Sequence, residues 1–91
     1  MLRILYTNQF KKDYKLIIKR GYDPKKLENI LNLLCSGNIL PEKNCDHPLL
    51  NSREYREVRE CHIAPDWLLI YRIENSELQL IRTGSHSDLF G

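Results

Sequence analysis

The histidines of this 91-residue sequence lie in three separate polar clusters, all in the second half of the chain. The clusters are Asp46-His47-Pro48, Cys61-His62 followed by Pro65-Asp66-Trp67, and Arg82-Thr83-Gly84-Ser85-His86. The unperturbed pKa of histidine lies near neutrality, so histidines that folding brings together can move protons, and an arginine beside them can stabilise phosphate charge. If folding joins the three clusters, the sequence predicts a small enzyme.

Each of these residues also has an ordinary structural interpretation. His47 could lie idle in a loop, and His62 could be a satisfied histidine of a sheet, on one face with Glu60 as a partner. Asp66 follows a proline in a turn, where aspartate is common for local hydrogen bonding. His86 lies beyond the last strand and could belong to a disordered tail. The residue types alone leave both interpretations open.

Arg82 interrupts an apolar strand, where alternation places it on the same face as Leu78 and Leu80. An arginine in that position needs a partner. The partner is either a carboxylate, from Glu57 or Glu60, or a phosphate bound on an open face of the sheet, for which the planar guanidinium is suited.

Two aromatic residues lie next to the polar clusters. Trp67 begins the most apolar strand, so packing is its first expected role and stacking on a base is the second. Phe90 is at the C-terminal end, where an ordered aromatic residue usually docks against something and where disorder is the alternative.

The histidines and cysteines lack the spacing of a metal site, because the sequence contains no HxH, HxxxH or CxxC pair. Cys35, Cys45 and Cys61 are odd in number and far apart, which argues against a disulfide framework. Cys61 and His62 are neighbours on a strand and point to opposite faces, so they do not suit a thiol–imidazole pair. We therefore expect no metal or other cofactor, and reduced, partly buried thiols.

Length and composition predict one domain over residues 1–91, because a chain of this size supports a single core. The 42% hydrophobic and 29% charged residues are typical of a folded soluble protein. The N-terminal segment turns charged within a few residues, and no apolar run approaches the ~20 residues of a membrane span. We expect a cytoplasmic protein without a signal peptide.

The positive charge is concentrated in one segment. Residues 11 to 26 contain seven lysines and arginines and two aspartates, a net charge of +5, while the rest of the chain has a net charge of −3. A positive region of this kind suits a polyanion such as RNA. A solvated, lysine-rich helix face is the alternative for any single lysine.

Apolar spacing near the N-terminus predicts a strand over residues 2–6 and two helices. Thr7 can cap the first helix, and Gly21 can end it. Its apolar stripe consists of Phe10, Tyr14, Ile17 and Ile18. Asp23-Pro24 predicts the start of a second helix that ends before Gly37. The apolar stripe of this helix consists of Leu27, Ile30, Leu31 and Leu34.

Prolines, glycines and asparagines are dense over residues 37–54, which predicts an irregular loop that holds His47. Residues 55–63, 67–73 and 78–83 predict three strands, with short turns that suit antiparallel hairpins. We therefore expect an α+β fold in which two N-terminal helices pack on one face of a small twisted antiparallel sheet. The other face is then free to carry a site.

Three parts of the sequence together resemble one protein family. The parts are Asp46-His47-Pro48-Leu49, Arg59-Glu60-Cys61-His62 running through Pro65-Asp66-Trp67 into Leu69-Ile70-Tyr71, and Arg82-Thr83-Gly84-Ser85-His86 with Leu89-Phe90-Gly91. In order, spacing and position of the C-terminus they are similar to the YafQ-type messenger-RNA interferase toxins of the RelE/ParE superfamily, from bacterial type II toxin–antitoxin systems. The resemblance covers nearly the whole chain and implies the same α+β fold.

The resemblance implies an endoribonuclease that cuts messenger RNA in the ribosomal A site without a metal. By position, the histidines His47, His62 and His86, together with Asp66, correspond to the family's catalytic or RNA-positioning residues. We expect His86 and Asp66 to be the main proton-transfer pair, and Arg82 to hold the scissile phosphate.

The resemblance also implies partners. A cognate, DinJ-like antitoxin would neutralise the toxin, which on its own would be monomeric. Lys11, Lys12 and Lys15 of the basic helix are expected to contact ribosomal RNA phosphates. Trp67 and Phe90 are weaker candidates for stacking on RNA or shaping the pocket.

Two alternatives belong to other functional classes. One is a non-enzymatic inhibitor that resembles the gyrase-poisoning ParE branch, against which the three histidines, Asp66 and Arg82 argue. The other is a pure binding module for an antitoxin or RNA, in which replacing His86 would change neither growth inhibition nor RNA integrity.

Overall fold

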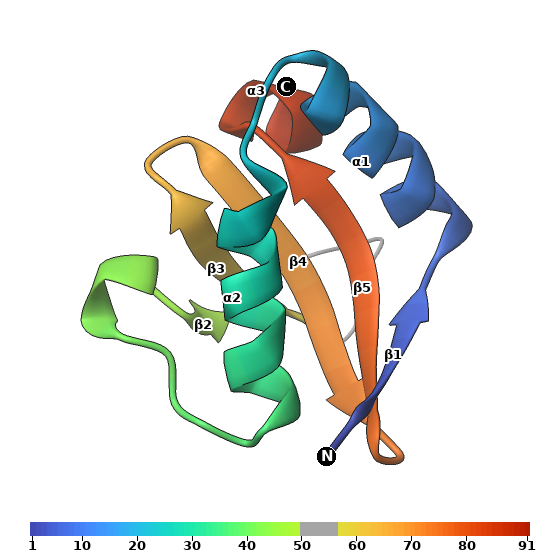
Figure 1. Cartoon of the computed structure of the whole chain (residues 1–91), viewed down its shortest axis with the longest axis vertical. Helices are drawn as coiled ribbons and strands as arrows, with labels where there is room; N and C mark the ends of the chain where they lie inside the picture. Colours follow the sequence, from blue (N-terminus) through green and yellow to red (C-terminus); the bar gives the residue numbers. More distant parts are fainter. Residues whose placement is uncertain (50–56) are drawn as a thin grey trace.

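The computed structural model describes residues 1–49 and 57–91 (Figure 1). Within these residues the strands are β1 Arg3–Tyr6, β2 His47–Pro48, β3 Arg59–Ala64, β4 Trp67–Glu74 and β5 Glu77–Gly84. The helices are α1 Asn8–Lys19, α2 Pro24–Cys35, the short 3₁₀ helix η1 Glu42–Asn44, and α3 His86–Phe90. The α+β class expected from the sequence is confirmed.

The strands form one sheet in the order β1-β5-β4-β3-β2 (Figure 1). Each strand from β2 to β5 is antiparallel to the next one, whereas β1 is parallel to β5. The sheet is therefore mixed, and the expectation of a purely antiparallel sheet is wrong at this edge. No turn joins β1 to β5, since the two helices and the other strands lie between them in the chain, so no hairpin fixes their relative direction.

Local signals set the bounds of α1 and α2, as the sequence predicts. The Thr7 hydroxyl accepts a hydrogen bond from the Phe10 N–H at 3.2 Å, and the Asp23 carboxylate accepts one from the Lys25 N–H at 3.0 Å. These bonds satisfy amide groups that have no partner within the helix. Gly21, just beyond α1, has a φ of +85°, which glycine adopts without strain.

The apolar stripe of α2 is buried as expected, but that of α1 is buried only in part. In α1, Phe10 and Ile17 are buried, whereas Ile18 is 40% exposed. Asp13 takes an inward position, because it lies three residues after Phe10 and four before Ile17. In the part of the chain that the structure describes, no helix is both long and apolar enough to cross a membrane.

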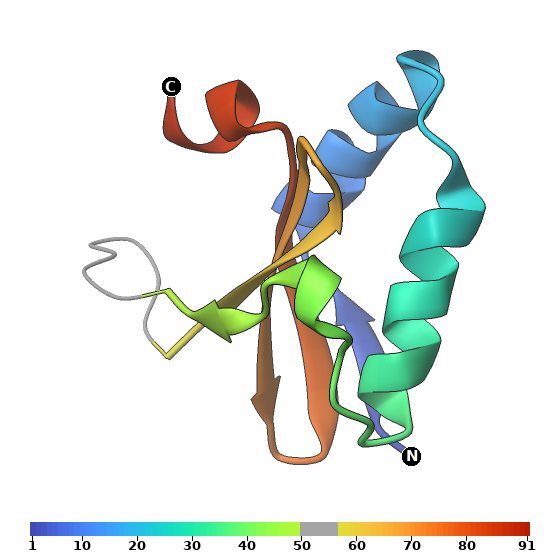
Figure 2. The ribbon, with the colours of Figure 1, turned by 90° about the vertical axis from the view of Figure 1, so that its left-hand side faces the viewer.

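The two faces of the sheet have different neighbours. Helices α1 and α2 cover one face, and α3 lies on the opposite side (Figure 2). The helix-covered face contains the main core, to which both helices and β3, β4 and β5 contribute. The other face carries a smaller apolar cluster of Val58, Ile70 and Ile81, against which Leu49 and Leu89 pack. The C-terminal segment is therefore an ordered helix rather than a disordered tail.

The segment expected as a loop over residues 37–54 contains two short elements, η1 and β2, in its described part. His47 lies in β2, opposite Glu60, and not in a loop, because the two residues of β2 bond to the edge of β3. Residues 50–56 lie outside the described residues and include the expected start of the next strand. Strand β3 begins at Arg59, later than the sequence predicts, and Glu57 precedes it with a φ of +53°.

Candidate active site

The register of the sheet places several predicted residues on the face that α1 and α2 leave open. His47 lies opposite Glu60, which lies opposite Ile70 on the next strand. Ile70 in turn lies opposite Arg82. Directly opposed residues in antiparallel strands point to the same face, so these side chains form a row across β2, β3, β4 and β5. Neighbouring strands are about 4.8 Å apart, so the row spans roughly 15 Å.

A second row and the ends of the strands complete this face. His62 lies opposite Leu68, and Leu68 lies opposite Gly84. Asp66 is in the turn between β3 and β4, at the same end of the sheet as Gly84, after which α3 begins with His86. The three histidines, Asp66 and Arg82 therefore lie on one face of the sheet or at one of its ends.

Two carboxylates hold the start of α3. The Asp66 carboxylate accepts a hydrogen bond from the backbone N–H of His86 at 3.2 Å. In the first turn, the Asp88 N–H donates to the Ser85 hydroxyl at 3.1 Å, and the Ser85 N–H donates to the Asp88 carboxylate at 2.9 Å. This capping box satisfies amide groups that the helix leaves unpaired. His86 is thereby fixed beside Asp66, through its backbone rather than through its imidazole.

A salt bridge ties α3 to the end of α1. Arg20 donates from both Nη atoms to the Asp88 carboxylate, at 2.5 and 3.1 Å. Arg20, together with the backbone N–H of Ser85, holds the pKa of the Asp88 carboxyl well below its usual range. Gly84 permits the close approach, because a Cβ atom there would lie 2.9 Å from the Cβ of Asp88. The position of His86 thus depends on contacts that sequence reasoning missed.

The rings of His86 and Phe90 lie one helical turn apart and contact each other. Their centroids are 5.5 Å apart, and the rings are inclined by 53°. Both residues are exposed, Phe90 at 51%. Phe90 is therefore ordered and can present a ring face to a ligand, while its predicted contact with RNA stays a prediction.

His47 is paired with a buried carboxylate. Its Nε2 lies 3.2 Å from an oxygen of Glu60, and its Nδ1 lies 2.9 Å from the carbonyl oxygen of Pro48. The side chain of Glu60 is 7% exposed and that of His47 is 48% exposed. Both ring nitrogens of His47 therefore face oxygens of this chain, and a substrate proton has to compete with these contacts.

Asp46 fixes the chain immediately before His47. Its carboxylate accepts a hydrogen bond from the Tyr71 hydroxyl at 2.6 Å and one from Nε of Arg59 at 3.1 Å. Burial, and then the hydrogen bond to Asp46, raise the pKa of the Tyr71 hydroxyl, so it remains a donor. Since Tyr71 belongs to the main core, this network links β2 and His47 to the rigid part of the fold.

His62 does not pair with Glu60, the partner that its position in the sequence suggests, because His47 engages that carboxylate. No hydrogen bond or ion pair of the His62 imidazole occurs within residues 1–49 and 57–91. Residue His62 also lines a hollow of about 490 Å³ between α2, η1 and β3, together with Lys26 and Lys43. This hollow lies on the α2 side of the sheet and is separate from the face that carries His47 and Arg82.

Arg82 does not share the face of Leu80, contrary to the simple alternation predicted from the sequence. Tyr71 lies opposite Leu80, whereas the preceding Ile70 lies opposite Arg82, so Ile81 is an extra residue in β5. A bulge of this kind shifts the alternation of side chains by one residue.

The carboxylate that pairs with Arg82 is Asp13 of α1, rather than Glu57 or Glu60. Nε and Nη2 of Arg82 donate to the two Asp13 oxygens, both at 2.9 Å. The backbone N–H of Thr83 donates to the same carboxylate at 3.3 Å. The side chains of Arg82 and Asp13 are 20% and 10% exposed. This pair fixes the orientation of the guanidinium at the bulge.

Trp67 lies in the main core, where it is 2% exposed. Its Nε1 donates to the Thr83 hydroxyl at 2.8 Å, and its ring meets that of Tyr22 edge to face with centroids 5.1 Å apart. The expectation of packing is confirmed. The prediction that Trp67 stacks on RNA is wrong, because its ring has no exposed face.

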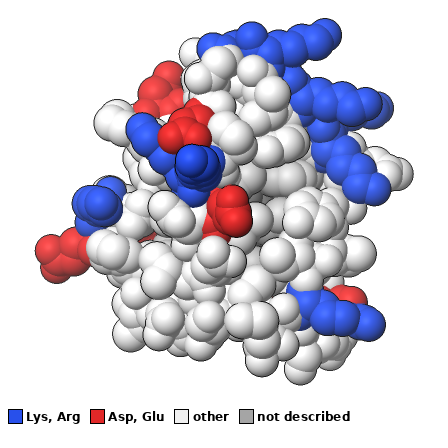
Figure 3. All heavy atoms as spheres, in the orientation of Figure 1, with Lys and Arg blue, Asp and Glu red and all other residues white. Residues whose placement is uncertain are grey.

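The lysines of α1 form a positive surface. Lys11, Lys12, Lys15 and Lys19 are all exposed, and Figure 3 shows their region of the surface, over α1 at the upper right, as predominantly basic. Asp13, the acidic residue among them, points inward and is paired with Arg82. It therefore offsets little of the positive potential that faces solvent.

The cysteines show no site of their own. Cys35 and Cys61 are buried and Cys45 is exposed, all as free thiols. Burial raises the pKa of the Cys61 thiol to about 12, which makes it a poor nucleophile. In the described part of the chain, no group of three or more His, Cys, Asp or Glu side chains could hold a metal ion.

Comparisons with known proteins agree in sequence and in structure. The family model described as the bacterial toxin of type II toxin-antitoxin system, YafQ, matches residues 2–91. The mRNA interferase toxin YafQ of Escherichia coli K12 is 42% identical over 89 residues, 97% of this chain and 95% of that protein.

Solved structures give the same result. In the Escherichia coli DinJ-YafQ complex, one chain matches with a TM-score of 0.89 and 41% identity over 100% of both chains. A metal-bound toxin from Helicobacter pylori matches with a TM-score of 0.91 and 41% identity, over 99% of this chain and 100% of that chain. By sequence and by fold, this chain belongs to the YafQ family of bacterial type II toxin–antitoxin toxins.

Proposed function

We propose that this chain is an endoribonuclease toxin that cleaves messenger RNA in the ribosomal A site and that a DinJ-like antitoxin inhibits. The observation that carries the proposal is the single sheet face that gathers His47, His62 and Arg82 and ends at Asp66 and His86. Family relatives named mRNA interferases, and one structure of a relative in complex with DinJ, support the reaction and the partner.

The reaction transfers protons at both ends of one phosphodiester. A base takes the proton of the ribose 2′-OH, and the resulting oxygen forms a bond to the adjacent phosphorus. The bond from phosphorus to the 5′ oxygen breaks, and an acid gives that oxygen a proton. The products are a 2′,3′-cyclic phosphate and a 5′-OH end. This sequence of steps requires proton carriers and charge stabilisation and no metal.

We assign proton transfer to His86 and Asp66, which lie together at the end of the sheet. Arg82 stabilises the charge that develops on the phosphate, held in orientation by its pair with Asp13. His47 and His62 orient the RNA, since both lie by register on the sheet face of Arg82 and His47 is held there by Glu60.

The basic surface of α1 serves attachment to the ribosome. Lys11, Lys12 and Lys15 contact ribosomal RNA phosphates through charge, and Phe90 supplies an exposed ring beside His86. In this proposal the toxin is one domain over residues 1–91, is monomeric when free and acts in the cytoplasm, where ribosomes and messenger RNA meet.

The test compares wild type, His86→Ala and Ser87→Ala, which alters an exposed neighbour on the same short helix. Each protein is expressed in bacteria under tight control, and 5′ ends are mapped by primer extension on a translated messenger and an untranslated copy. We expect new in-frame cuts with wild type and Ser87→Ala on the translated copy alone, and none with His86→Ala.

Other outcomes would replace the proposal. Growth arrest by wild type without cuts would favour a gyrase-type inhibitor. Growth arrest and RNA integrity that are the same for wild type and His86→Ala would favour a binding module.

A further inference from the structure

Helix α1 carries an acidic and a basic residue that form ion pairs with the segment around the proposed site. Asp13 pairs with Arg82 of β5, and Arg20, at the C-terminal end of α1, pairs with Asp88 of α3. Positions 13 and 20 are about two helical turns apart, so the two residues lie on nearly the same face of α1, roughly 10 Å apart along its axis. One helix face therefore holds both the arginine assigned to the phosphate and the helix that begins with His86.

Arg20 holds the first turn of α3 through both Nη atoms, which donate to the two Asp88 oxygens at 2.5 and 3.1 Å. A planar guanidinium matches a carboxylate in this arrangement, whereas a lysine ammonium acts as a point charge and does not fix the orientation of its partner. The Asp88 oxygen that Nη1 contacts also accepts the Ser85 N–H at 2.9 Å. The next amide, that of His86, donates to Asp66. Arg20 thus supplies a contact to α3 from the opposite side of the sheet.

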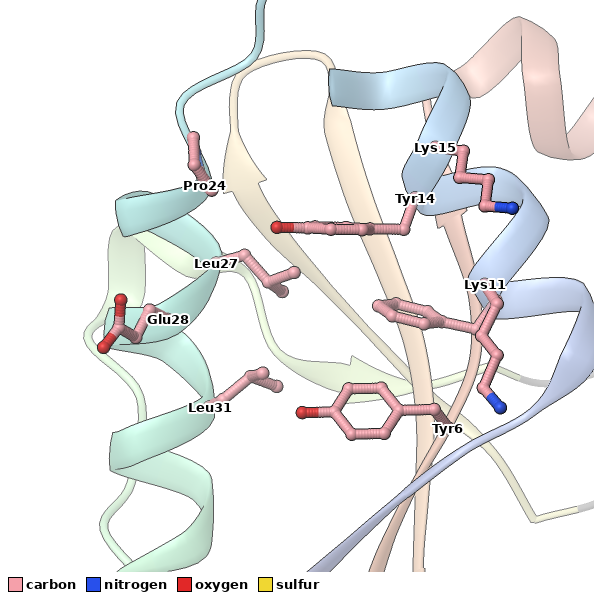
Figure 4. A pocket seen from close by; sticks show the side chains of 9 residues that line it. Tyr6, Lys11, Tyr14, Lys15, Pro24, Leu27, Glu28 and Leu31 are labelled. Carbon is pink, nitrogen blue, oxygen red and sulfur yellow. The ribbon is translucent and has the colours of Figure 1, made fainter. Parts of the chain in front are cut away.

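Helix α1 is itself firmly anchored, so it can serve as a frame. Phe10 and Ile17 are 2% and 1% exposed and belong to the main core. Tyr14 extends from α1 toward Leu27 of α2 (Figure 4). At the start of the helix, the Thr7 hydroxyl donates to a carbonyl oxygen of β5 at 2.8 Å. The helix is therefore tied to the core and to β5, which gives its C-terminal residue a defined position relative to that strand.

Arg20 differs from the lysines of α1. Its neighbour Lys19 is exposed and forms no salt bridge within residues 1–49 and 57–91. The side chains of Arg20 and Asp88 are 39% and 22% exposed. A carboxylate in contact with a guanidinium offsets most of the potential that the guanidinium would present to RNA. The ion pair therefore suits the positioning of α3 better than attachment to a polyanion.

We propose that Arg20 is a positioning residue for RNA cleavage, and that α1 is the frame that sets the distance between the side chains of Arg82 and His86. Asp13 holds Arg82, and Arg20 holds the helix of His86 through Asp88. Cleavage needs charge stabilisation and proton transfer at the same phosphodiester, so an error in the separation of these two groups slows the reaction. This consequence rests on the proposed function, whereas the ordering of α3 by Arg20 does not.

The first test compares Arg20→Gln with Lys19→Gln, which remove equal charge from adjacent positions. Single-turnover cleavage is measured in a defined ribosome complex with the ribosome at saturation, together with the affinity of each variant for the ribosome. We expect Arg20→Gln to slow cleavage by about tenfold or more and Lys19→Gln to stay within about twofold of wild type. The two variants should have the same effect on affinity.

Further variants test whether Arg20 acts through Asp88. Arg20→Lys keeps the charge without the two-bond arrangement, so it should restore only part of the rate, and it decides the matter if Arg20→Gln does not fold. Asp88→Asn weakens the same ion pair from the other side. Arg20→Gln/Asp88→Asn should therefore be no slower than the slower of its two single variants. Losses that multiply in the double variant would overturn the proposal, because Arg20 would then act elsewhere.

The last measurement needs no RNA. The backbone order of Ser87, an exposed residue of α3, is measured by NMR relaxation of its amide in free wild type, Arg20→Gln and Lys19→Gln. Urea titration shows whether each protein is folded. We expect the order of α3 to fall in Arg20→Gln alone.

Unchanged order of α3 in Arg20→Gln, or cleavage at the wild-type rate, would overturn the proposal. A loss confined to ribosome affinity would also overturn it, because Arg20 would then be an RNA contact. If wild type itself leaves messenger RNA intact, the endoribonuclease proposal fails, and the order of α3 still decides whether Arg20 positions that helix.

Discussion

On the face of the sheet that α1 and α2 cover, apolar side chains pack against one another, whereas on the face toward α3 His47 pairs with Glu60 and the Asp66 carboxylate holds the backbone N–H of His86. Burial of apolar surface area stabilises the helix-covered face, and this stabilisation is spread over many residues. On the face toward α3, a few hydrogen bonds and ion pairs orient the polar residues. From this difference we infer that the stability of the fold and the activity of the site depend on different residues. A single substitution should therefore affect either unfolding free energy or cleavage more than the other.

The largest expected effect is a loss of stability on the helix-covered face. Trp67→Ala removes a side chain that is 2% exposed and its hydrogen bond to Thr83, and it should cost about 3–5 kcal/mol of unfolding free energy. Phe90→Ala, at 51% exposure, should cost less than about 1 kcal/mol. Urea titration measures both. A similar loss from the two variants would remove the distinction between the faces.

Asp13 joins the two faces, because it lies on α1 and pairs with Arg82 of β5. Asp13→Ala should cost about 2–3 kcal/mol, since it removes a largely buried carboxylate that accepts two hydrogen bonds from Arg82. Asp23→Ala, which removes only the cap of α2, should cost about 1 kcal/mol. Thermal unfolding measures the stability of both variants. A greater loss of stability from Asp23→Ala than from Asp13→Ala would contradict this expectation.

Gly84 should separate stability from activity. Gly84→Ala brings a Cβ atom to 2.9 Å from that of Asp88, so α3 has to move and cleavage should fall by about tenfold or more. Gly37→Ala, at a φ of +77° with nothing within 4 Å, should lose about 1 kcal/mol of stability and keep wild-type cleavage. RNA cleavage and unfolding free energy are measured for both variants. Normal cleavage by Gly84→Ala would show that the position of α3 is unimportant.

The smallest expected effect is a local response of α3 to pH. The pKa of Asp88 is lowered in the folded state, so its carboxylate stabilises the fold above its unfolded pKa of about 3.9, and this contribution is lost as the pH falls below that value. Hydrogen exchange of the Ser85 and Asp88 amides, corrected for intrinsic rates, should therefore become faster at acidic pH. In Asp88→Asn the same amides should show no such change.

Much of the fold follows from local sequence. The caps at Thr7 and Asp23, the glycine at position 21 and the apolar stripe of α2 each act within a few residues, and all match the structure. The parallel pairing of β1 with β5 does not follow in this way, because it joins segments more than 70 residues apart and no turn dictates it. Long-range pairing is what a single sequence indicates least.

The site follows from the sequence only in part. Residue types identified the three clusters, but strict alternation misplaced Arg82, since a bulge at Ile81 cannot be read from apolar spacing. The position of Asp13 could have been recognised in the sequence, because it lies on the apolar stripe of α1 between Phe10 and Ile17. The lysines on either side of it made the segment look uniformly basic. An acidic residue at a buried helix position requires a cationic partner.

The decisive measurement is the rate of messenger cleavage in a defined ribosome complex, in a single turnover, with wild type, His86→Ala and Asp66→Asn. We expect wild type to leave a 2′,3′-cyclic phosphate and each variant to be slower by about 100-fold or more while still folded and bound to antitoxin. Wild-type rates from both variants, or 3′-hydroxyl ends from wild type, would contradict acid–base cleavage by these two residues.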